Sequence, residues 1–101
     1  MTIFANKILA LVRQIPRGKV TTYKILALKI GSASLARPVG NALHKNPYLI
    51  KIPCHRVVKS SGEIGNYQLG LAKKRKMLQN EGIKIKAGKI ENFTDILYNF
   101  N

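Results

Sequence analysis

The sequence predicts a mainly α-helical fold: a winged-helix-like three-helix bundle with a helix-turn-helix and a small β wing. Two observations predict it. Apolar residues recur at helical spacing near the start of the chain, and a short turn containing glycine separates the next two predicted helices. The chain has 101 residues and is 46% apolar, which suffices for one small domain with its own core. We therefore expect a single domain over residues 1–101.

The first predicted helix covers about residues 3–15. Its apolar positions follow helical spacing: Phe4, Ile8, Leu11, Val12 and Ile15. Pro16 and Gly18 end it, because proline lacks a backbone N–H and glycine favours turns. Residues 19–21 then form a short extended link.

The second predicted helix covers roughly residues 23–30. Thr21 or Thr22 caps its N-terminus, since a threonine hydroxyl can accept a hydrogen bond from a free N–H of the first turn. Gly31 ends this helix.

A turn over residues 32–34 leads to a third predicted helix over about residues 36–45. Pro38 must lie in its first turn, where a missing N–H does least harm. Two helices joined by a short turn that contains Gly31 form the predicted helix-turn-helix.

The second half of the chain is less regular. Residues 48–58 form an irregular, apolar and partly extended segment, and residues 59–63 form a turn, which we expect to be the tip of a β-hairpin wing. A loop over residues 65–70 precedes a basic helix over residues 71–80. The tail shows no clear motif, although residues 92–98 can form a short closing helix.

The charge of the chain points to a polyanionic partner. Eighteen Lys and Arg residues against four Asp and Glu residues give a formal net charge of +14. Nucleic acid is the simplest such partner. A solubility device or a thermophile-like bias is the alternative, but thermophiles normally raise Glu together with Lys. We expect no membrane association, because no apolar run approaches bilayer length and the basic residues do not follow one long amphipathic helix.

Cys54 is the only cysteine, and it stands between Pro53 and His55. It cannot form an internal disulfide, and with His44 and His55 it cannot complete a four-ligand zinc site, so we expect no bound metal. The thiol is either structural or reactive, and the neighbouring histidine and basic residues favour a reactive one. One cysteine without a disulfide framework and a start without a secretory layout indicate a reducing, cytoplasmic location.

The sequence Pro53-Cys54-His55-Arg56-Val57 resembles the active-site signature of the O6-alkylguanine-DNA alkyltransferases, also called methylated-DNA–protein-cysteine methyltransferases. The resemblance is free of gaps at this signature and runs from about Gly18 to Gly82. It implies the catalytic, C-terminal domain of that family without the N-terminal domain that most members carry. It also implies a reaction without a cofactor.

The resemblance implies four catalytic residues. Cys54 matches the cysteine that accepts the alkyl group, and His55 matches the general base that acts through a water molecule. Glu81 matches the acid that orients this histidine, and a carboxylate at the end of a helix opposes the macrodipole, which indicates a role other than helix stability. Tyr23 matches the donor to guanine N3, although a core tyrosine at the start of a helix is an alternative.

Four residues match positions that bind the base. Tyr67 and Gln68 match the loop that covers the flipped base and presents an N–H to guanine O6. The family often has a pair of smaller residues after the tyrosine, so we expect the larger pair Gln68-Leu69 to narrow the pocket and limit bulky alkyl groups. The carbonyl groups of Cys54 and Val57 would accept from the exocyclic amine, and Asn46 would tie the third helix to the cysteine segment.

The remaining matches concern DNA. Arg37 matches the arginine that replaces the flipped nucleotide in the base stack, with a phosphate contact as its alternative. Gly40 and Ala42 would let the third helix approach the minor groove closely. Further candidates for phosphate contacts, or for a solvated face, are Thr22, His44, Arg56 and the run Lys73-Lys74-Arg75-Lys76.

The resemblance implies a monomeric DNA repair protein that acts on double-stranded DNA containing O6-alkylguanine, with O4-alkylthymine as a second candidate lesion. The alkyl group would pass to Cys54 and inactivate the protein. Two alternatives are an alkyltransferase-like protein that binds the lesion without repair, and a winged-helix regulator with an incidental cysteine. The first alternative lacks the acceptor cysteine, and the second leaves Tyr23, Arg37 and Glu81 unexplained.

Overall fold

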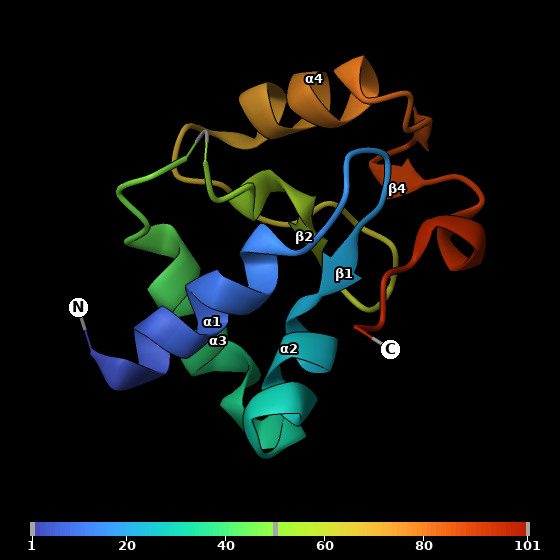
Figure 1. Ribbon diagram of the computed structural model, residues 1–101. Coiled ribbons are helices and arrows are strands. Elements are labelled where there is room, and N and C mark those ends of the chain that lie inside the picture. Colours follow the sequence, from blue (N-terminus) through green and yellow to red (C-terminus); the bar gives the residue numbers. More distant parts are fainter. Residues whose placement is uncertain (1, 50, 101) are drawn as a thin grey trace.

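The computed structural model describes residues 2–49 and 51–100; Met1, Asn101 and Ile50, which belongs to the segment predicted as irregular, lie outside the described residues. The helices are α1 (Ile3–Arg13), α2 (Tyr23–Ile30), α3 (Ala36–His44) and α4 (Leu71–Asn80). All four predicted helices are confirmed, and α1 ends two residues earlier than expected. The first three helices gather on one side of the molecule, and α4 crosses the opposite side (Figure 1).

Local capping explains where the first helices begin. The Thr2 hydroxyl accepts a hydrogen bond from the Ala5 N–H, and the Thr22 hydroxyl accepts one from the Ile25 N–H, each at 3.0 Å. Thr22 is therefore the predicted cap of α2. Gly31 follows α2 with a φ of 152°, which a residue with a Cβ rarely adopts.

The turn between α2 and α3 contains a short 3₁₀ helix, η1 (Ala33–Leu35). Pro38 is the third residue of α3 and lies in its first turn, as predicted. Helices α2 and α3 pack against each other and against α1, which confirms the predicted helix-turn-helix within a three-helix bundle.

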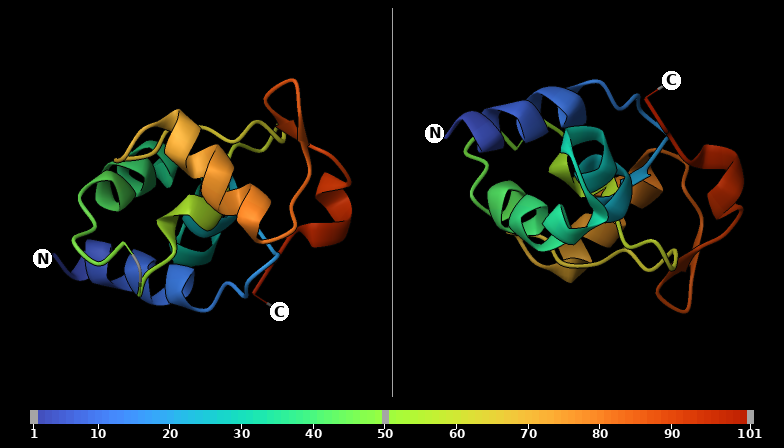
Figure 2. Two further views of the ribbon diagram at one scale, coloured as in Figure 1. Left: turned by 90° about the horizontal axis from the view of Figure 1, so that it is seen from above. Right: turned by 90° about the horizontal axis from the view of Figure 1, so that it is seen from below.

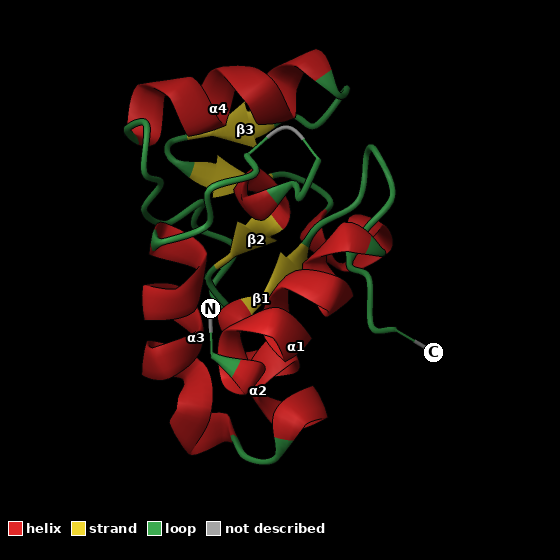
Figure 3. Ribbon diagram, turned by 60° about the vertical axis from the view of Figure 1, so that its left-hand side comes forward, coloured by secondary structure: helices red, strands yellow, loops and turns green. Residues whose placement is uncertain are grey.

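Two short strands join the helix-turn-helix to the cysteine segment. β1 (Thr21–Thr22) pairs in parallel with β2 (Val57–Val58), with Thr21 opposite Val57. The pairing places the start of α2 beside the residues that follow Cys54. Both strands lie between the three-helix bundle and α4 (Figure 3).

The predicted position of the wing was wrong. Residues 59–63 do form a turn, closed by a 2.9 Å hydrogen bond from the Lys59 N–H to the Glu63 carbonyl, but the segments that flank it do not pair as strands. The antiparallel hairpin consists of β3 (Ile85–Lys86) and β4 (Lys89–Ile90). Val57 and Val58 pair with β1 instead, and Glu63, at the end of the turn, forms an isolated bridge with Lys89 of β4.

The tail packs as a closing segment. A 3₁₀ helix, η3 (Phe93–Ile96), follows β4, which confirms the short closing helix expected over residues 92–98. The hairpin and η3 lie at the end of the molecule away from α3 (Figure 2). They cover a second apolar cluster beneath α4, formed with Val20, Val58 and Leu78.

The main core lies beneath the helix-turn-helix. It joins α1, α2 and α3 through residues such as Ile8, Leu26 and Val39, and it also includes Cys54 and Tyr67. The cysteine is thus part of the wall of the core. Among the described residues, no helix is both long and apolar enough to cross a membrane.

Candidate active site around Cys54

Cys54 opens onto a cavity of about 460 Å³ between the helix-turn-helix and the loop that precedes α4. The residues that line it come from α2, α3, the cysteine segment and the following loops: Tyr23, Ala36, Arg37, Gly40, Asn41, Leu43, His44, Cys54, Lys59, Asn66, Tyr67 and Gln68. The parallel pairing of β1 with β2 brings these elements together. The cavity combines a cysteine, two tyrosines and basic residues at one opening.

The Cys54 thiol is 5% exposed and has two polar neighbours. The Asn46 amide donates to Sγ at 2.8 Å, and Sγ lies 3.8 Å from the Leu43 carbonyl oxygen, to which the S–H can donate. Burial raises the pKa of the Cys54 thiol to about 11, although the Asn46 hydrogen bond and the Lys74 charge oppose this rise. The resting thiol is therefore neutral, and it needs a base to become a nucleophile.

His55 supplies a group that can act as this base. It follows Cys54 in a 3₁₀ turn, η2 (Cys54–Arg56), and its Nε2 lies 2.7 Å from Glu81 Oε2. A hydrogen on Nε2 leaves the lone pair of Nδ1 free to accept a proton. Nδ1 is buried and has no hydrogen-bond partner among the described residues. Burial lowers the pKa of His55, and the Glu81 carboxylate opposes this shift.

Glu81 is held by several donors at the end of α4. The Arg56 guanidinium donates from Nε and Nη2 at 3.0 and 2.9 Å, and the Gly18 N–H donates at 3.3 Å. Burial alone would raise the pKa of Glu81, but the hydrogen bonds from Arg56 and His55 outweigh it and lower the pKa. The carboxylate therefore stays charged and orients the imidazole.

Arg56, which was predicted to contact phosphate or to lie on a solvated face, is partly buried, and its phosphate contact stays a prediction. Besides Glu81, its guanidinium binds the Ile15 carbonyl at 2.7 Å, so the side chain is used inside the molecule. It joins the end of the first helix region to the Glu81 carboxylate.

Tyr23 is the first residue of α2 and lines the cavity. Its hydroxyl lies 3.5 Å from the Asn66 carbonyl oxygen. Burial, together with negative charge on Cys54, raises the pKa of Tyr23 to about 12, so the phenol keeps its proton at neutral pH and remains a donor. A Cβ added at Gly40 would lie 4.0 Å from the Tyr23 ring, so Gly40 packs beside this ring in the wall of the cavity.

The loop before α4 closes over the cavity. Tyr67 is 9% exposed, and its buried hydroxyl has no hydrogen-bond partner among the described residues. The Gln68 amide donates to the carbonyl groups of Leu43 at 3.2 Å and Asn46 at 2.8 Å. These carbonyls lie at the C-terminal end of α3 and just beyond it, and the Leu43 carbonyl also accepts from the Asn46 N–H at 3.1 Å. Gln68 thus fastens the covering loop to α3.

Asn46 has the connecting position that was expected. It is 1% exposed, its amide donates to the Ile52 carbonyl at 3.1 Å, and its side-chain oxygen accepts from the Tyr48 N–H at 2.8 Å. It therefore connects the end of α3 to the cysteine segment and also stops the helix before Pro47. Val57 is buried in β2, and its carbonyl accepts from Lys74 at 2.7 Å.

The predicted DNA contacts divide into two groups. Arg37 and His44 are exposed on α3 at the opening of the cavity. Thr22 is 3% exposed with its hydroxyl used as the α2 cap, and Ala42 is 8% exposed beside a second cavity next to α1. The side chains of Thr22 and Ala42 are therefore buried, and their predicted roles at the DNA stay predictions.

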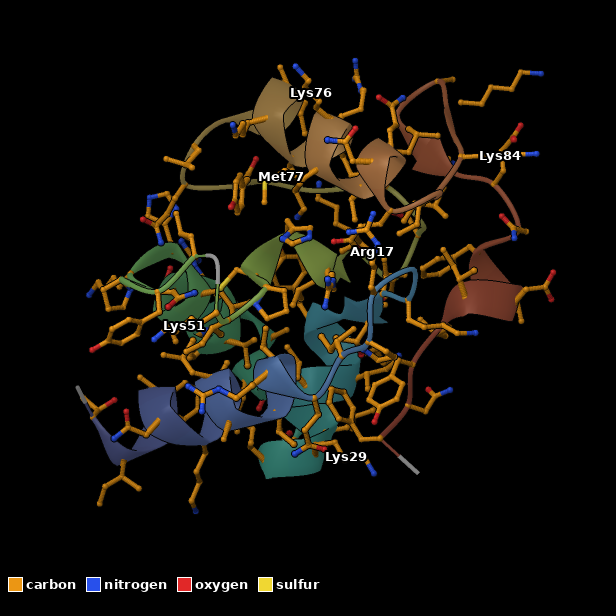
Figure 4. The ribbon with its side chains drawn as sticks, turned by 45° about the horizontal axis from the view of Figure 1, so that its top comes forward. Arg17, Lys29, Lys51, Lys76, Met77 and Lys84 are labelled. Carbon is orange, nitrogen blue, oxygen red and sulfur yellow. The ribbon has the colours of Figure 1, made fainter. Side chains whose placement is uncertain are left out.

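Lys74 also differs from its prediction. It was expected on a solvated or phosphate-binding face, yet it is 0% exposed. All other lysine and arginine side chains are exposed except the partly buried Arg56. On α4, Lys76 lies on the outer side and Met77 on the side that faces the molecule (Figure 4). One signal in the sequence could have revealed the burial of Lys74. This lysine is four residues before the buried Leu78 and therefore lies on the same face of the helix.

The positive charge is spread over the molecule. Lys29, Lys51, Lys76 and Lys84 come from separate segments and lie on different sides of it (Figure 4).

Within residues 2–49 and 51–100, no group of three or more His, Cys, Asp or Glu residues could hold a metal ion.

Fold and site together define a helix-turn-helix domain with a buried cysteine at a cavity, followed in the chain by a buried histidine that is paired with a glutamate. Residues 3–83 match the family described as 6-O-methylguanine DNA methyltransferase, DNA binding domain, and the chain belongs to this family of DNA repair methyltransferases.

Two curated relatives illustrate the match. The chain is 51% identical over 74 residues to a methylated-DNA–protein-cysteine methyltransferase of Saccharolobus islandicus, and 43% identical over 82 residues to a bifunctional methyltransferase/endonuclease of Picrophilus torridus. The matches cover 73% and 81% of this chain, but 47% and 28% of the relatives. The chain thus spans about half the length of the first relative and a smaller share of the second.

Two solved structures share the fold. Schizosaccharomyces pombe Atl1, in complex with damaged DNA containing O6-carboxymethylguanine, has a TM-score of 0.81 at 30% identity, with 97% of this chain and 98% of Atl1 covered. Mycobacterium tuberculosis OGT, in complex with DNA, has a TM-score of 0.78 at 36% identity, with 81% and 50% covered.

Proposed function

We propose that this protein repairs O6-alkylguanine in DNA by transferring the alkyl group to Cys54. One observation carries the proposal: a buried thiol lines the cavity, and the next residue in the chain is a buried histidine whose Nε2 lies 2.7 Å from Glu81 Oε2. A nucleophile, a base and a group that orients the base are the parts that nucleophilic catalysis requires.

The transfer begins at the thiol. His55 accepts the thiol proton through a water molecule, and the Asn46 amide, 2.8 Å from Sγ, stabilises the thiolate that forms. The sulfur lone pair then forms a bond to the alkyl carbon, and the bond from this carbon to guanine O6 breaks. The electron pair of the broken bond stays on the guanine.

Tyr23 serves the leaving base. Its hydroxyl lines the same cavity as the thiol and keeps its proton at neutral pH, so it can donate to guanine N3 as negative charge develops there. The Tyr67 and Gln68 loop covers the base. The product is a thioether at Cys54. The reverse step would require the Cys54 sulfur to leave the alkyl carbon, which it does not do, so each protein molecule reacts once.

Double-stranded DNA is the proposed partner. A net charge of +14 favours phosphate binding, and the structural relatives were crystallised with DNA. Cys54 is buried at a cavity of the domain, so a base that is stacked in the duplex cannot reach it and must first leave the duplex. Arg37, exposed at the opening of the cavity, is placed to fill the vacated position, while α3 lies in the minor groove.

We further infer that this domain contains every residue that the transfer uses, as a single catalytic domain. All the groups named above lie between Gly18 and Gly82, although the curated relatives are longer. The protein with this sequence alone should therefore carry out the reaction.

Lesion binding without repair is the second candidate function, because Atl1 matches this chain over nearly the full length of both. Cys54 with its His55 and Glu81 partners favours repair, since binding alone requires no activated thiol. The test is to digest an O6-methylguanine duplex to nucleosides after incubation. Repair predicts that O6-methylguanine disappears and guanine appears, and that Cys54→Ser abolishes this change while it retains binding. Persistent O6-methylguanine in a saturated complex would support the second candidate.

A further inference from the structure

Lys59 is a cation at the cavity that the steps above do not use. It directly follows β2, begins the turn over residues 59–63 and lines the cavity together with Tyr23 and Cys54. Its side chain is exposed, and within residues 2–49 and 51–100 its ammonium forms no ion pair. The cavity therefore carries a positive charge that no partner in the described chain neutralises.

Gly65 shows on which side of the cavity this lysine lies. A Cβ added at Gly65 would lie 3.5 Å from Lys59 Cγ and 3.3 Å from the Tyr23 hydroxyl oxygen. The lysine stem and the tyrosine hydroxyl thus pack against the same glycine, whose φ of 76° favours a residue without a Cβ. Lys59 therefore lies on the Tyr23 side of the cavity.

The electrostatics of Lys74 agree with this position. Burial lowers the pKa of Lys74 to about 7, and the charge on Lys59 lowers it further, while negative charge on Cys54 opposes the shift. Lys74 Nζ lies 3.5 Å from the Tyr23 hydroxyl oxygen, so the Lys59 charge acts close to this hydroxyl.

The Tyr23 side of the cavity is also where the backbone of a bound nucleotide must lie. In the proposed reaction Tyr23 donates to guanine N3. This atom is bonded to C4, C4 is bonded to N9, and N9 carries the sugar. The alkyl group is on O6, and the carbon that bears O6 lies across the ring from N3. A cation beside Tyr23 is therefore near the sugar and its phosphates, whereas Cys54 faces the alkyl group.

The charges near Lys59 leave it available for a phosphate. Arg37 and His44 line the same cavity, and among the described residues no Asp or Glu does so. Glu63, the acid nearest to Lys59 in the sequence, instead accepts from the Ser61 hydroxyl at 3.0 Å. A lysine that is not neutralised and is exposed beside a nucleotide site is suited to an ion pair with a phosphate oxygen.

We propose that Lys59 binds a backbone phosphate that flanks the flipped nucleotide, and so holds this nucleotide in the cavity with its alkyl carbon toward Cys54. This role rests on the proposed function. It differs from the role of Arg37, which fills the position that the base vacates in the duplex. The contact of Lys59 is with the extruded nucleotide itself, so it is needed whether or not the DNA is double-stranded.

The first test measures Lys59→Met, which keeps the apolar stem and removes the charge. The substrates are a single-stranded oligonucleotide with one O6-methylguanine, which requires no base flipping, and free O6-benzylguanine, which has no phosphate. We expect the second-order rate constant for the oligonucleotide to fall roughly tenfold, as for loss of a charge-assisted hydrogen bond, and that for the free base to stay the same. Equal losses on both substrates would overturn the proposal.

Lys29→Met is the matched control. Lys29 is an exposed residue of the last turn of α2 and does not line the cavity, so its loss lowers the net charge by the same amount. It should change the ratio of the two rate constants much less than Lys59→Met. An equal change in this control would show that only net charge matters and would overturn the proposal.

A double-mutant cycle identifies the phosphate. An uncharged methylphosphonate replaces, in turn, the phosphate on the 5′ side and on the 3′ side of O6-methylguanine. At one of these two positions it should slow the wild-type protein about as much as Lys59→Met does, and it should cause little further loss in Lys59→Met. Undiminished losses in the variant at both positions would overturn the contact.

A wild-type protein that transfers no alkyl group is a separate result, which overturns the proposed function. The same cycle is then measured as affinity for the same oligonucleotides. Coupling between Lys59 and one flanking phosphate would support the contact in a lesion-binding protein, and additive losses would overturn it.

Discussion

Glu81 Oε2 lies 2.7 Å from His55 Nε2, although the two residues are 26 positions apart in the sequence. The contact joins the end of α4 to the 3₁₀ turn that carries Cys54, and Arg56 holds the same carboxylate at 2.9 Å. Because both side chains are only 6% exposed, the interaction is shielded from solvent and orients the imidazole strongly.

Glu81→Gln should slow transfer from O6-methylguanine DNA by roughly 10²-fold, because a neutral amide no longer stabilises the imidazolium that forms when His55 accepts the thiol proton. The rate is measured by quenched-flow or manual sampling of the methylated DNA. Glu91→Gln removes an exposed carboxylate and is the control. An unchanged rate in a folded Glu81→Gln protein would exclude an orienting role.

Arg37→Ala should weaken repair of duplex DNA far more than reaction with free O6-benzylguanine, because only the duplex requires a base to be flipped out. Single-turnover rates on the two substrates give the comparison. Arg13→Ala removes an exposed arginine from α1, which is not among the predicted DNA contacts, and should leave the ratio of the rates unchanged. Equal losses on both substrates would argue against base flipping by Arg37.

Gln68→Ala should widen the range of alkyl groups that the protein accepts. The two hydrogen bonds of Gln68 to the end of α3 hold the covering loop close to the thiol, and truncation removes both the bonds and the side chain from the cavity wall. Transfer of a benzyl group relative to a methyl group is expected to rise, while Gln79→Ala, on the exposed part of α4, leaves the ratio unchanged. A ratio that stays constant in Gln68→Ala would show that Gln68 does not limit the alkyl group.

The free energy of unfolding of the wild-type protein, relative to Lys74→Met, should rise as the pH increases from about 7 toward 10. The folded-state pKa of Lys74 is lowered from 10.5 to about 7, so in this range the unfolded chain binds more protons at this residue than the folded chain. The stability difference therefore increases with pH. Urea unfolding at pH 7, 8 and 9 measures it, and a difference that is constant or falls with pH would contradict the lowered pKa.

The helices could be predicted because their signals are local. Apolar spacing defined α1, the Thr22 cap and Gly31 defined α2, and Pro38 marked the first turn of α3. The wing was misplaced because β3 and β4 have only two residues each and so show no alternating pattern, and because β2, which precedes the predicted tip, pairs with β1. β1 and β2 have two residues each, which is too short for an alternating pattern, and they pair across 36 positions, from Thr21 to Val57.

A reactive thiol at Cys54 could be predicted from its neighbours in the sequence, and the roles of His55 and Glu81 were implied by the resemblance to the alkyltransferase family. The environment of the basic residues could not be predicted. Arg56 contacts the Ile15 carbonyl, 41 positions away, and Lys74 contacts the Val57 carbonyl in β2. Backbone carbonyls leave no mark in a sequence, so a buried lysine within a basic run resembles its exposed neighbours. Only its helical spacing from Leu78 distinguishes Lys74.

The intact mass of the protein after incubation with excess O6-methylguanine duplex tests the central claim most directly. The account predicts that the protein gains the mass of one methyl group in place of one hydrogen, that peptide mapping places it on Cys54, and that a second dose of DNA adds nothing. A protein that binds the lesion and keeps its original mass, or that gains the methyl group at another residue, would contradict the account.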